Sequence, residues 1–237
     1  MSATSIAGSE VARVLVEAEP LGAVAQPPFS ASVILPNEVT RPGWRWHRLV
    51  DLARLATGHT PSRRKPEYWD GDIPWLQLPD IRALDGRVTT DTADHTNALG
   101  IANSAAVLLP PGTVCLSRTA SVGFVTIMGR EMATSQDFVN WVCGPDLDPK
   151  FLMYLFIACR EQIRSLGSGA VHQTIYFPTV EQFSICAPRI DEQRRLAARM
   201  ATSLEATESV IARAQEQLAA AEALPAAILR AAFSGAA

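Results

Sequence analysis

Four short stretches of the chain carry side chains that suit contact with a nucleic acid. The first follows Gly58 and joins two hydroxyl groups to three successive cations, at Thr60, Ser62, Arg63, Arg64 and Lys65. Hydroxyls and cations commonly hold phosphate oxygens, so this stretch predicts a phosphate-binding loop. An exposed basic loop without a ligand is the alternative that these residue types leave open.

The other three stretches carry groups that read the edges of bases. In chain order they are Ser117, Arg118, Thr119 and Ser121, then Gln136, Asp137 and Asn140, then His172, Gln173 and Thr174. An arginine binds a guanine edge or a phosphate through two N–H groups, whereas amides and carboxylates pair with adenine or cytosine. A surface hairpin, or buried polar groups, would give the same pattern. Tyr68 is a further candidate contact, while Trp75 is expected to pack in a core.

The sequence lacks the motifs that catalysis would need. It has no glycine-rich nucleotide loop, no Walker lysine and no Asp/Asn-Pro-Pro-Tyr/Phe methyl-transfer motif. No two of the four histidines have metal-ligand spacing. Asp146, Asp148 and Lys150 resemble a metal-nuclease cluster, but the neighbouring prolines predict a turn there. We therefore expect a chain that recognises a partner and binds no metal or cofactor itself.

Charge is unevenly distributed along the 237 residues, whose formal net charge is −3. Between Arg41 and Lys65 there are seven basic residues and one acid, whereas Pro66 to Asp94 holds seven acids and two arginines. The net charge argues weakly against a protein that coats nucleic acid indiscriminately. The basic run favours a lobe directed at phosphates, and a solvated surface of mixed sign is the alternative.

The chain shows no targeting or membrane signal. Its apolar runs are far shorter than the roughly 20 residues that span a bilayer, and its N-terminus has no basic region followed by an apolar core. The four cysteines have no CxxC spacing, which favours reduced, buried thiols over a zinc site or a disulfide framework. We expect a cytoplasmic protein with no membrane partner.

Turn signals and hydrophobic periodicity divide the chain into three parts. Residues 1–40 predict a short helix from Glu10 to Glu19 and then a linker. Residues 41–188 predict a domain of the α+β class. Its expected strands and helix are Val107–Leu109, Thr113–Ser117, Val122–Met128 and Lys150–Leu166.

The last part, residues 189–237, predicts a single long helix with one apolar stripe. No glycine interrupts it between Pro188 and Gly235, and Asp191 is a suitable N-cap. Apolar side chains recur every three or four residues, chiefly Leu196, Met200, Leu204, Ile211 and Leu218. This spacing is typical of a coiled-coil seam, and a helix of roughly 60 Å is longer than a small domain can cover. A core helix of the same domain is the alternative, and Pro225 predicts a kink or a second segment.

A series of short motifs runs through the chain in a fixed order. They are Gly43–Trp46, Leu49–Ala53, Thr57–Ser62, Pro66–Trp75, Asn103–Ala105, Leu109–Thr113, Ser117–Gly123, Ala133–Phe138, Ser168–Gly169, Glu192–Arg195 and Ile228–Gly235. In this order and spacing they resemble a target recognition domain, and the helix after it, of the specificity subunits of type I restriction-modification systems. The resemblance covers about residues 42–235, and residues 1–40 match no family pattern.

The resemblance implies a non-catalytic DNA specificity subunit. Family members usually carry two recognition domains, each followed by a long helix, whereas this sequence carries one of each and resembles a half-length form. Two copies, or this chain and another specificity half, would pair head to tail, and each domain would read one half of a bipartite double-stranded DNA target. Methyltransferase subunits would dock and supply S-adenosylmethionine, and restriction subunits that use ATP and Mg²⁺ could join them.

Two other classes of protein stay open on the sequence alone. One is a coiled-coil adaptor that binds no DNA. The other is a separately encoded recognition module of another methyltransferase or nuclease. Salt-dependent DNA binding would separate the adaptor from the rest, and co-purification with a methyltransferase would separate the remaining two.

Overall fold

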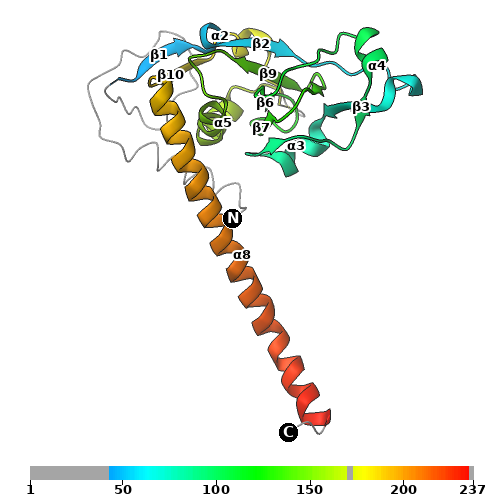
Figure 1. Cartoon of the computed structure of the whole chain (residues 1–237), viewed down its shortest axis with the longest axis vertical. Coiled ribbons are helices and arrows are strands. Elements are labelled where there is room, and N and C mark those ends of the chain that lie inside the picture. Colours follow the sequence, from blue (N-terminus) through cyan, green and yellow to red (C-terminus); the bar gives the residue numbers. More distant parts are fainter. Residues whose placement is uncertain (1–42, 170–172, 235–237) are drawn as a thin grey trace. The chain divides into compact units, whose positions relative to one another are not determined.

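The computed structural model describes residues 43–169 and 173–234. The chain divides into two units, the first ending at Ala197 and the second starting at Ala198. The helix and linker expected within residues 1–40 lie outside the described residues, as does His172. The described part is a mixed α/β unit with a long C-terminal helix, which confirms the fold class predicted from the sequence (Figure 1).

The described strands of the first unit form three sheets (Figure 1). Their bounds are β1 Arg45–Arg48, β2 Ala53–Thr57, β3 Trp69–Leu76, β4 Val88–Thr89, β5 His95–Thr96, β6 Val114–Ser117, β7 Val125–Met128, β8 Ala133–Thr134, β9 Phe138–Cys143 and β10 Ser184–Ala187. The largest sheet has the order β2-β9-β6-β7-β4, in which only β4 and β7 are parallel. The orders of the other two are β5-β3-β8 and β1-β10. Strands that pair are often distant in sequence, so the loops between them meet from separate parts of the chain.

Short helices pack against these sheets. They are α2 Leu49–Leu52, α3 Leu78–Leu84, α4 Ala98–Ala102, α5 Pro149–Ala158, α6 Arg160–Ser165 and α7 Phe177–Val180, with a 3-10 turn, η1, at Pro66–Tyr68. Helix α5 contacts β6 and β7, and its residues from Phe151 to Ile157 are all buried. Because α5 is covered on all sides, its sequence is almost continuously apolar. The ring of Phe183 also packs in this core. Its centroid lies 6.3 Å from that of the Trp141 ring and 6.4 Å from that of the Phe156 ring.

The single helix expected over Lys150–Leu166 is wrong, because the chain breaks at Cys159 into α5 and α6. After the break, Arg160 Nη2 donates to both carboxylate oxygens of Asp85 at 2.8 Å, and Nε donates to the Gly123 carbonyl at 2.9 Å. The two side chains are only 9% and 7% exposed. Burial raises the pKa of Asp85, and the charge of Arg160 opposes that rise. This buried pair joins the start of α6 to the end of α3.

The strand expected at Val107–Leu109 is also wrong. Leu109 forms an isolated bridge with Met132, but Val107 and Leu108 are 40% and 38% exposed. The next two residues are prolines, which have no N–H group to extend a ladder. The strands expected at Thr113–Ser117 and Val122–Met128 form as β6 and β7, although β7 begins only at Val125.

Helix α8 runs from Ile190 to Ser234, and its first turns belong to the first unit. Gln193 is 1% exposed and satisfies three main-chain groups around this start. Its Nε2 donates to the carbonyls of Asp146 and Pro188 at 3.0 and 2.9 Å, and its Oε1 accepts the Asp148 N–H at 2.9 Å. Leu196 is also buried, at 1% exposure. The polar motif after Pro188 therefore anchors the beginning of the helix.

The second unit is the helical segment from Ala198 onward. The helix continues through Pro225, so that proline does not begin a separate segment. Along the predicted seam Met200 is 1% exposed, Leu204 and Ile211 are half-buried and Leu218 is 60% exposed. No helix in residues 43–169 or 173–234 is long and apolar enough to cross a membrane.

Candidate nucleic-acid interface

Main-chain hydrogen bonds bring together loops from separate parts of the first unit. The His59 N–H donates to the Thr134 carbonyl at 2.9 Å, which joins the loop after β2 to the end of β8. The Arg118 N–H donates to the Asp137 carbonyl at 2.8 Å, and the Ala120 N–H donates to the Gln173 carbonyl at 3.0 Å. We call residues 58–65, 117–121, 134–137 and 173–176 the loop cluster. Each of the four stretches predicted from the sequence contributes residues to it.

Arg63, the first of the three successive cations, is held within the unit. Its guanidinium carbon lies 3.7 Å from the ring centroid of Trp69 and 4.8 Å from that of Trp75. It forms an ion pair with Asp94 and a hydrogen bond of 3.5 Å to Gln77 Oε1, and its side chain is 48% exposed. The sequence alone did not indicate this ion pair, because only the fold brings the acidic segment that ends at Asp94 next to the basic segment that contains Arg63. A carboxylate of the chain thus already neutralises this cation.

The residues next to Arg63 are placed differently. Ser62 and Arg64 are exposed, and the Ser62 carbonyl accepts the Trp69 indole N–H at 3.2 Å. Lys65 Nζ donates to the Tyr68 hydroxyl at 2.9 Å, and this hydrogen bond raises the pKa of Lys65. Tyr68 is only 5% exposed, so it supports Lys65 and offers no ring face to a base. Trp75 is 3% exposed, which confirms that it packs in the core.

Arg118 fastens the loops of the cluster to one another. Its Nε donates to the Gln136 carbonyl at 3.1 Å, and its Nη1 donates to the Ile175 carbonyl at 3.3 Å. Partial burial lowers its pKa, and the nearby Asp137 and Tyr176 oppose that change. An arginine nevertheless stays cationic at neutral pH. Its half-buried guanidinium therefore adds positive charge to the cluster while two of its N–H groups serve the main chain.

Gln136 is exposed on the turn between β8 and β9, where Ser135 is buried and Asp137 is half-buried. Thr60 Oγ1 donates to Gln136 Oε1 at 2.6 Å, which links the predicted phosphate-binding loop to a predicted base-reading amide. Ser135 Oγ donates to Asp137 Oδ2 at 2.9 Å, so that carboxylate bonds within its own turn.

The last predicted stretch is described from Gln173 onward. Gln173 is exposed, while Thr174 is half-buried and forms an isolated bridge with Thr119.

Three of the candidate contacts lie inside the unit. Ser117 and Asn140 are 0% exposed, and Ser121 is 9% exposed. Ser117 Oγ donates to the carbonyls of Ser121 and Phe124, and Asn140 Nδ2 donates to Thr134 Oγ1 at 2.8 Å. Asn140 lies on the strand β9, which pairs with both β2 and β6, and its side chain is buried. In this conformation the three side chains have structural roles and offer no surface to DNA.

One residue of the cluster was missed by the sequence analysis. Tyr176 is 60% exposed and lies close enough to Arg118 to affect its pKa. An exposed aromatic ring beside a cation suits stacking on a nucleic-acid base. In the sequence Tyr176 stands between Ile175 and Phe177, a context that indicates core packing as readily as exposure. No local signal could have found it.

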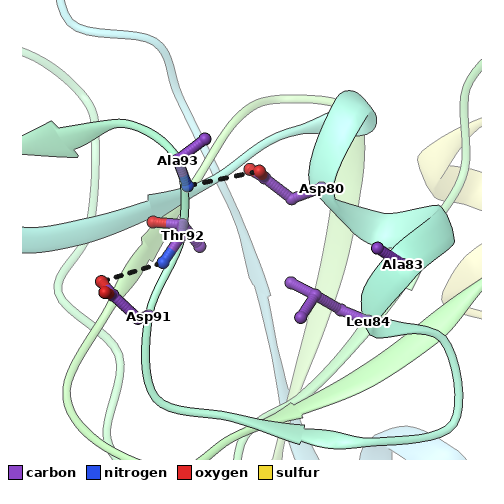
Figure 2. Close-up of a pocket in the computed structure, with 6 residues that line it drawn as sticks. All are labelled: Asp80, Ala83, Leu84, Asp91, Thr92 and Ala93. Carbon is purple, nitrogen blue, oxygen red and sulfur yellow. Dashed lines mark hydrogen bonds between the residues drawn. The ribbon is translucent and has the colours of Figure 1, made fainter.

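A shallow hollow of about 280 Å³ lies outside the cluster, between α3 and the loop that precedes β5 (Figure 2). Asp80 accepts the Ala93 N–H at 3.3 Å, and Asp91 accepts the Thr92 N–H at 3.0 Å (Figure 2). Asp91 Oδ1 also lies 2.7 Å from His95 Nε2. Among the residues with described positions, no group of three or more His, Cys, Asp or Glu side chains could hold a metal ion. Asp148, from the nuclease-like trio, instead caps α5 by accepting the Phe151 N–H at 2.9 Å.

The family model for the type I restriction modification DNA specificity domain matches residues 42–219. The chain belongs to this family. It is 26% identical over 156 residues to the specificity subunit of type I restriction enzyme MjaIX from Methanocaldococcus jannaschii. It is 27% identical over 130 residues to the specificity subunit of type I restriction enzyme HindI from Haemophilus influenzae. These matches cover 65% and 54% of this chain but 36% and 28% of the relatives, so the chain spans about a third of their length.

Solved structures share the fold at low sequence identity. A chain of a type I R-M system superposes with a TM-score of 0.71 at 19% identity, over 98% of this chain and 52% of that one. The HsdS subunit from Thermoanaerobacter tengcongensis superposes with a TM-score of 0.61 at 17% identity, over 90% of this chain and 46% of that one. This chain therefore spans about half of each of these solved chains, and both support its mixed α/β fold.

Proposed function

We propose that this chain recognises DNA sequence for a type I restriction-modification system and reads one half of a bipartite target. The loop cluster carries the proposal, because a single set of bonded loops holds exposed cationic, amide and aromatic side chains. Arg64 and Lys65 suit phosphate oxygens, whereas Gln136 and Gln173 suit base edges. Hydrogen bonds from Arg118 to the Gln136 and Ile175 carbonyls hold the loops that carry Gln136 and Gln173.

A second specificity unit would supply the other half-site. Three apolar side chains of α8, Leu218, Leu224 and Ile228, are 60%, 56% and 58% exposed, and such side chains favour a helical partner. In this proposal α8 pairs head to tail with the same helix of a second copy, or with that of another specificity half. The paired helices then set the length of the unread gap. For two identical copies the two-fold symmetry makes the target a palindrome.

Catalysis belongs to the partners in this proposal, and the assembly works in the cytoplasm. Methyltransferase subunits bind S-adenosylmethionine and take the target adenine out of the duplex, since its amino group is inaccessible to chemistry in the stack. Restriction subunits that use ATP and Mg²⁺ are a further partner. The chain itself contributes recognition and spacing and binds no cofactor.

A methylome comparison tests the proposal. The chain is expressed together with its methyltransferase in a host that lacks background adenine methylation, and the control strain expresses the methyltransferase alone. We expect methylated adenines in one motif of two half-sites separated by an unread gap, and only when the chain is present. Identical methylomes in both strains would contradict the proposal and would favour the coiled-coil adaptor.

A further inference from the structure

Gln136 is fixed more firmly than an exposed side chain requires. The Ser135 N–H donates to the Leu76 carbonyl at 2.9 Å, and the Asp137 carbonyl accepts the Arg118 N–H at 2.8 Å, so the main chain is held on both sides. The Gln136 carbonyl accepts Arg118 Nε at 3.1 Å, and its Oε1 accepts the Thr60 hydroxyl at 2.6 Å. Holding an exposed glutamine in one rotamer costs conformational entropy that burial does not repay. Such an arrangement fits a group that must meet a ligand in one orientation.

The groups that Gln136 still offers decide which base it suits. Thr60 uses one lone pair of Oε1, which leaves a second acceptor site and the two N–H groups of Nε2. In the major groove, adenine presents the N7 acceptor beside the N6 amino donor, and one glutamine amide satisfies both. Guanine presents two acceptors there, so the amide oxygen would meet no donor. The remaining acceptor and donors of Gln136 therefore match adenine.

We propose that Gln136 selects an adenine at one position of the half-site and that Thr60 and Arg118 are its positioning residues. This inference rests on the proposed function, since it names the base that one side chain of the cluster reads. The Thr60 hydroxyl holds the amide end of Gln136 beside the loop at residues 58–65. Arg118 holds the turn that carries Gln136 and ties it to the loop at residues 173–176.

The test selects targets for the full chain, with its methyltransferase where the two co-purify, from a library of randomised DNA duplexes. Dissociation constants are then measured for the selected duplex and for each single-position change. The unaltered chain is expected to prefer adenine at one position by roughly 5- to 150-fold, the ratio that a bidentate base contact provides. Gln136→Ala removes the preference at that position and keeps it at the others.

Two further measurements separate base reading from folding. Thr60→Val deletes the hydroxyl at nearly constant volume and weakens the preference for the same adenine, whereas Thr60→Ser restores it. Replacing that adenine by 7-deazaadenine, which lacks the N7 acceptor, weakens binding to the unaltered chain and leaves binding to Gln136→Ala unchanged. Gln182→Ala is the matched control, because Gln182 is an exposed glutamine outside the loop cluster. Its base preferences equal those of the unaltered chain.

Three outcomes overturn the assignment of Gln136: base preferences that survive Gln136→Ala, an equal loss at every position, or a preferred base other than adenine at the altered position. A wild-type chain that selects no duplex and shows no salt-dependent binding overturns the proposed function itself, and this inference with it. Selection of a clear target whose preferences ignore Gln136 overturns the inference alone.

Discussion

The loop cluster and the second unit of α8 are stabilised in different ways. The cluster depends on hydrogen bonds between residues far apart in sequence, such as Thr60 with Gln136 and Arg118 with Ile175. The helix from Ala198 onward depends on local main-chain hydrogen bonds, and side chains such as Leu224 are more than half exposed. An isolated helix gains little stability from local bonds alone, so tertiary or partner contacts must supply the rest. The cluster is thus held by contacts within the described part of one chain, whereas in our proposal a second helix covers the apolar stripe.

Charges on the helical seam should have the largest effect. Leu204→Glu, Ile211→Glu and Leu218→Glu together are expected to abolish pairing, because burial of each side chain contributes about 1.5–3 kcal/mol. Glutamate has a helix propensity similar to that of leucine, so any fall in the helical circular dichroism signal reports the loss of partner contacts. The monomer keeps weak affinity for one half-site and loses the avidity of the full target. Sedimentation and binding to full and half sites measure both effects.

The matched control for the seam replaces Glu205 and Glu216, which are exposed, with glutamine. These changes should leave pairing intact. A triple seam variant that remains a dimer would place the dimer interface elsewhere and would remove the contrast between the two regions.

Loss of the buried ion pair should act on the first unit alone. Asp85→Ala leaves the Arg160 guanidinium buried without its carboxylate, which is expected to lower the free energy of unfolding by about 3–5 kcal/mol. Glu161→Gln breaks the exposed pair with Arg164 and should cost about 0–1 kcal/mol. Urea denaturation followed by tryptophan fluorescence compares the two. An equal decrease in the free energy of unfolding for the two variants would show that the buried Asp85 pair stabilises the unit no more than the exposed Glu161 pair.

Loss of the cations in the loop at residues 58–65 should change the salt dependence of DNA binding, which is the smallest of these effects. Replacing Arg63, Arg64 and Lys65 with alanine is expected to weaken binding to all DNA and to flatten the plot of log affinity against log salt by roughly one unit per lost contact. Arg64→Ala should flatten it more than Arg63→Ala, because Asp94 already pairs with Arg63. Asp94→Asn, which releases Arg63, should steepen the slope. An unchanged slope in the triple variant would remove this loop from the interface.

The sequence predicts the long helix well because its signals are local. A repeat of apolar residues without glycine predicts the helix that forms as Ile190–Ser234. Local signals also find the polar stretches of the loop cluster, since residue type marks hydroxyls, cations and amides. The break at Cys159 is missed, because the apolar periodicity continues through it, and the contact of Arg160 with Asp85 beside it joins residues distant in sequence.

The exposure of the candidate contact residues could not be predicted in the same way. Gln136 and Asn140 belong to the same predicted base-reading stretch. Asn140 is nevertheless buried, whereas Gln136 is exposed. Gln136 lies on the turn before β9 and Asn140 on β9 itself, and the packing around each is not a property of the stretch. The same reasoning explains Asp94, whose partner Arg63 is set by the fold, and Tyr176, whose exposure has no local signature.

The stoichiometry of the DNA complex tests the central claim most directly. Sedimentation velocity measures the mass of the full chain bound to a duplex that carries the complete methylation motif, and to a duplex that carries one half-site. Our account predicts two recognition domains on the complete motif, related by the pairing of their helices, and a much weaker complex on the half-site. Saturation of the complete motif by one recognition domain, with equal affinity for the half-site, would contradict it.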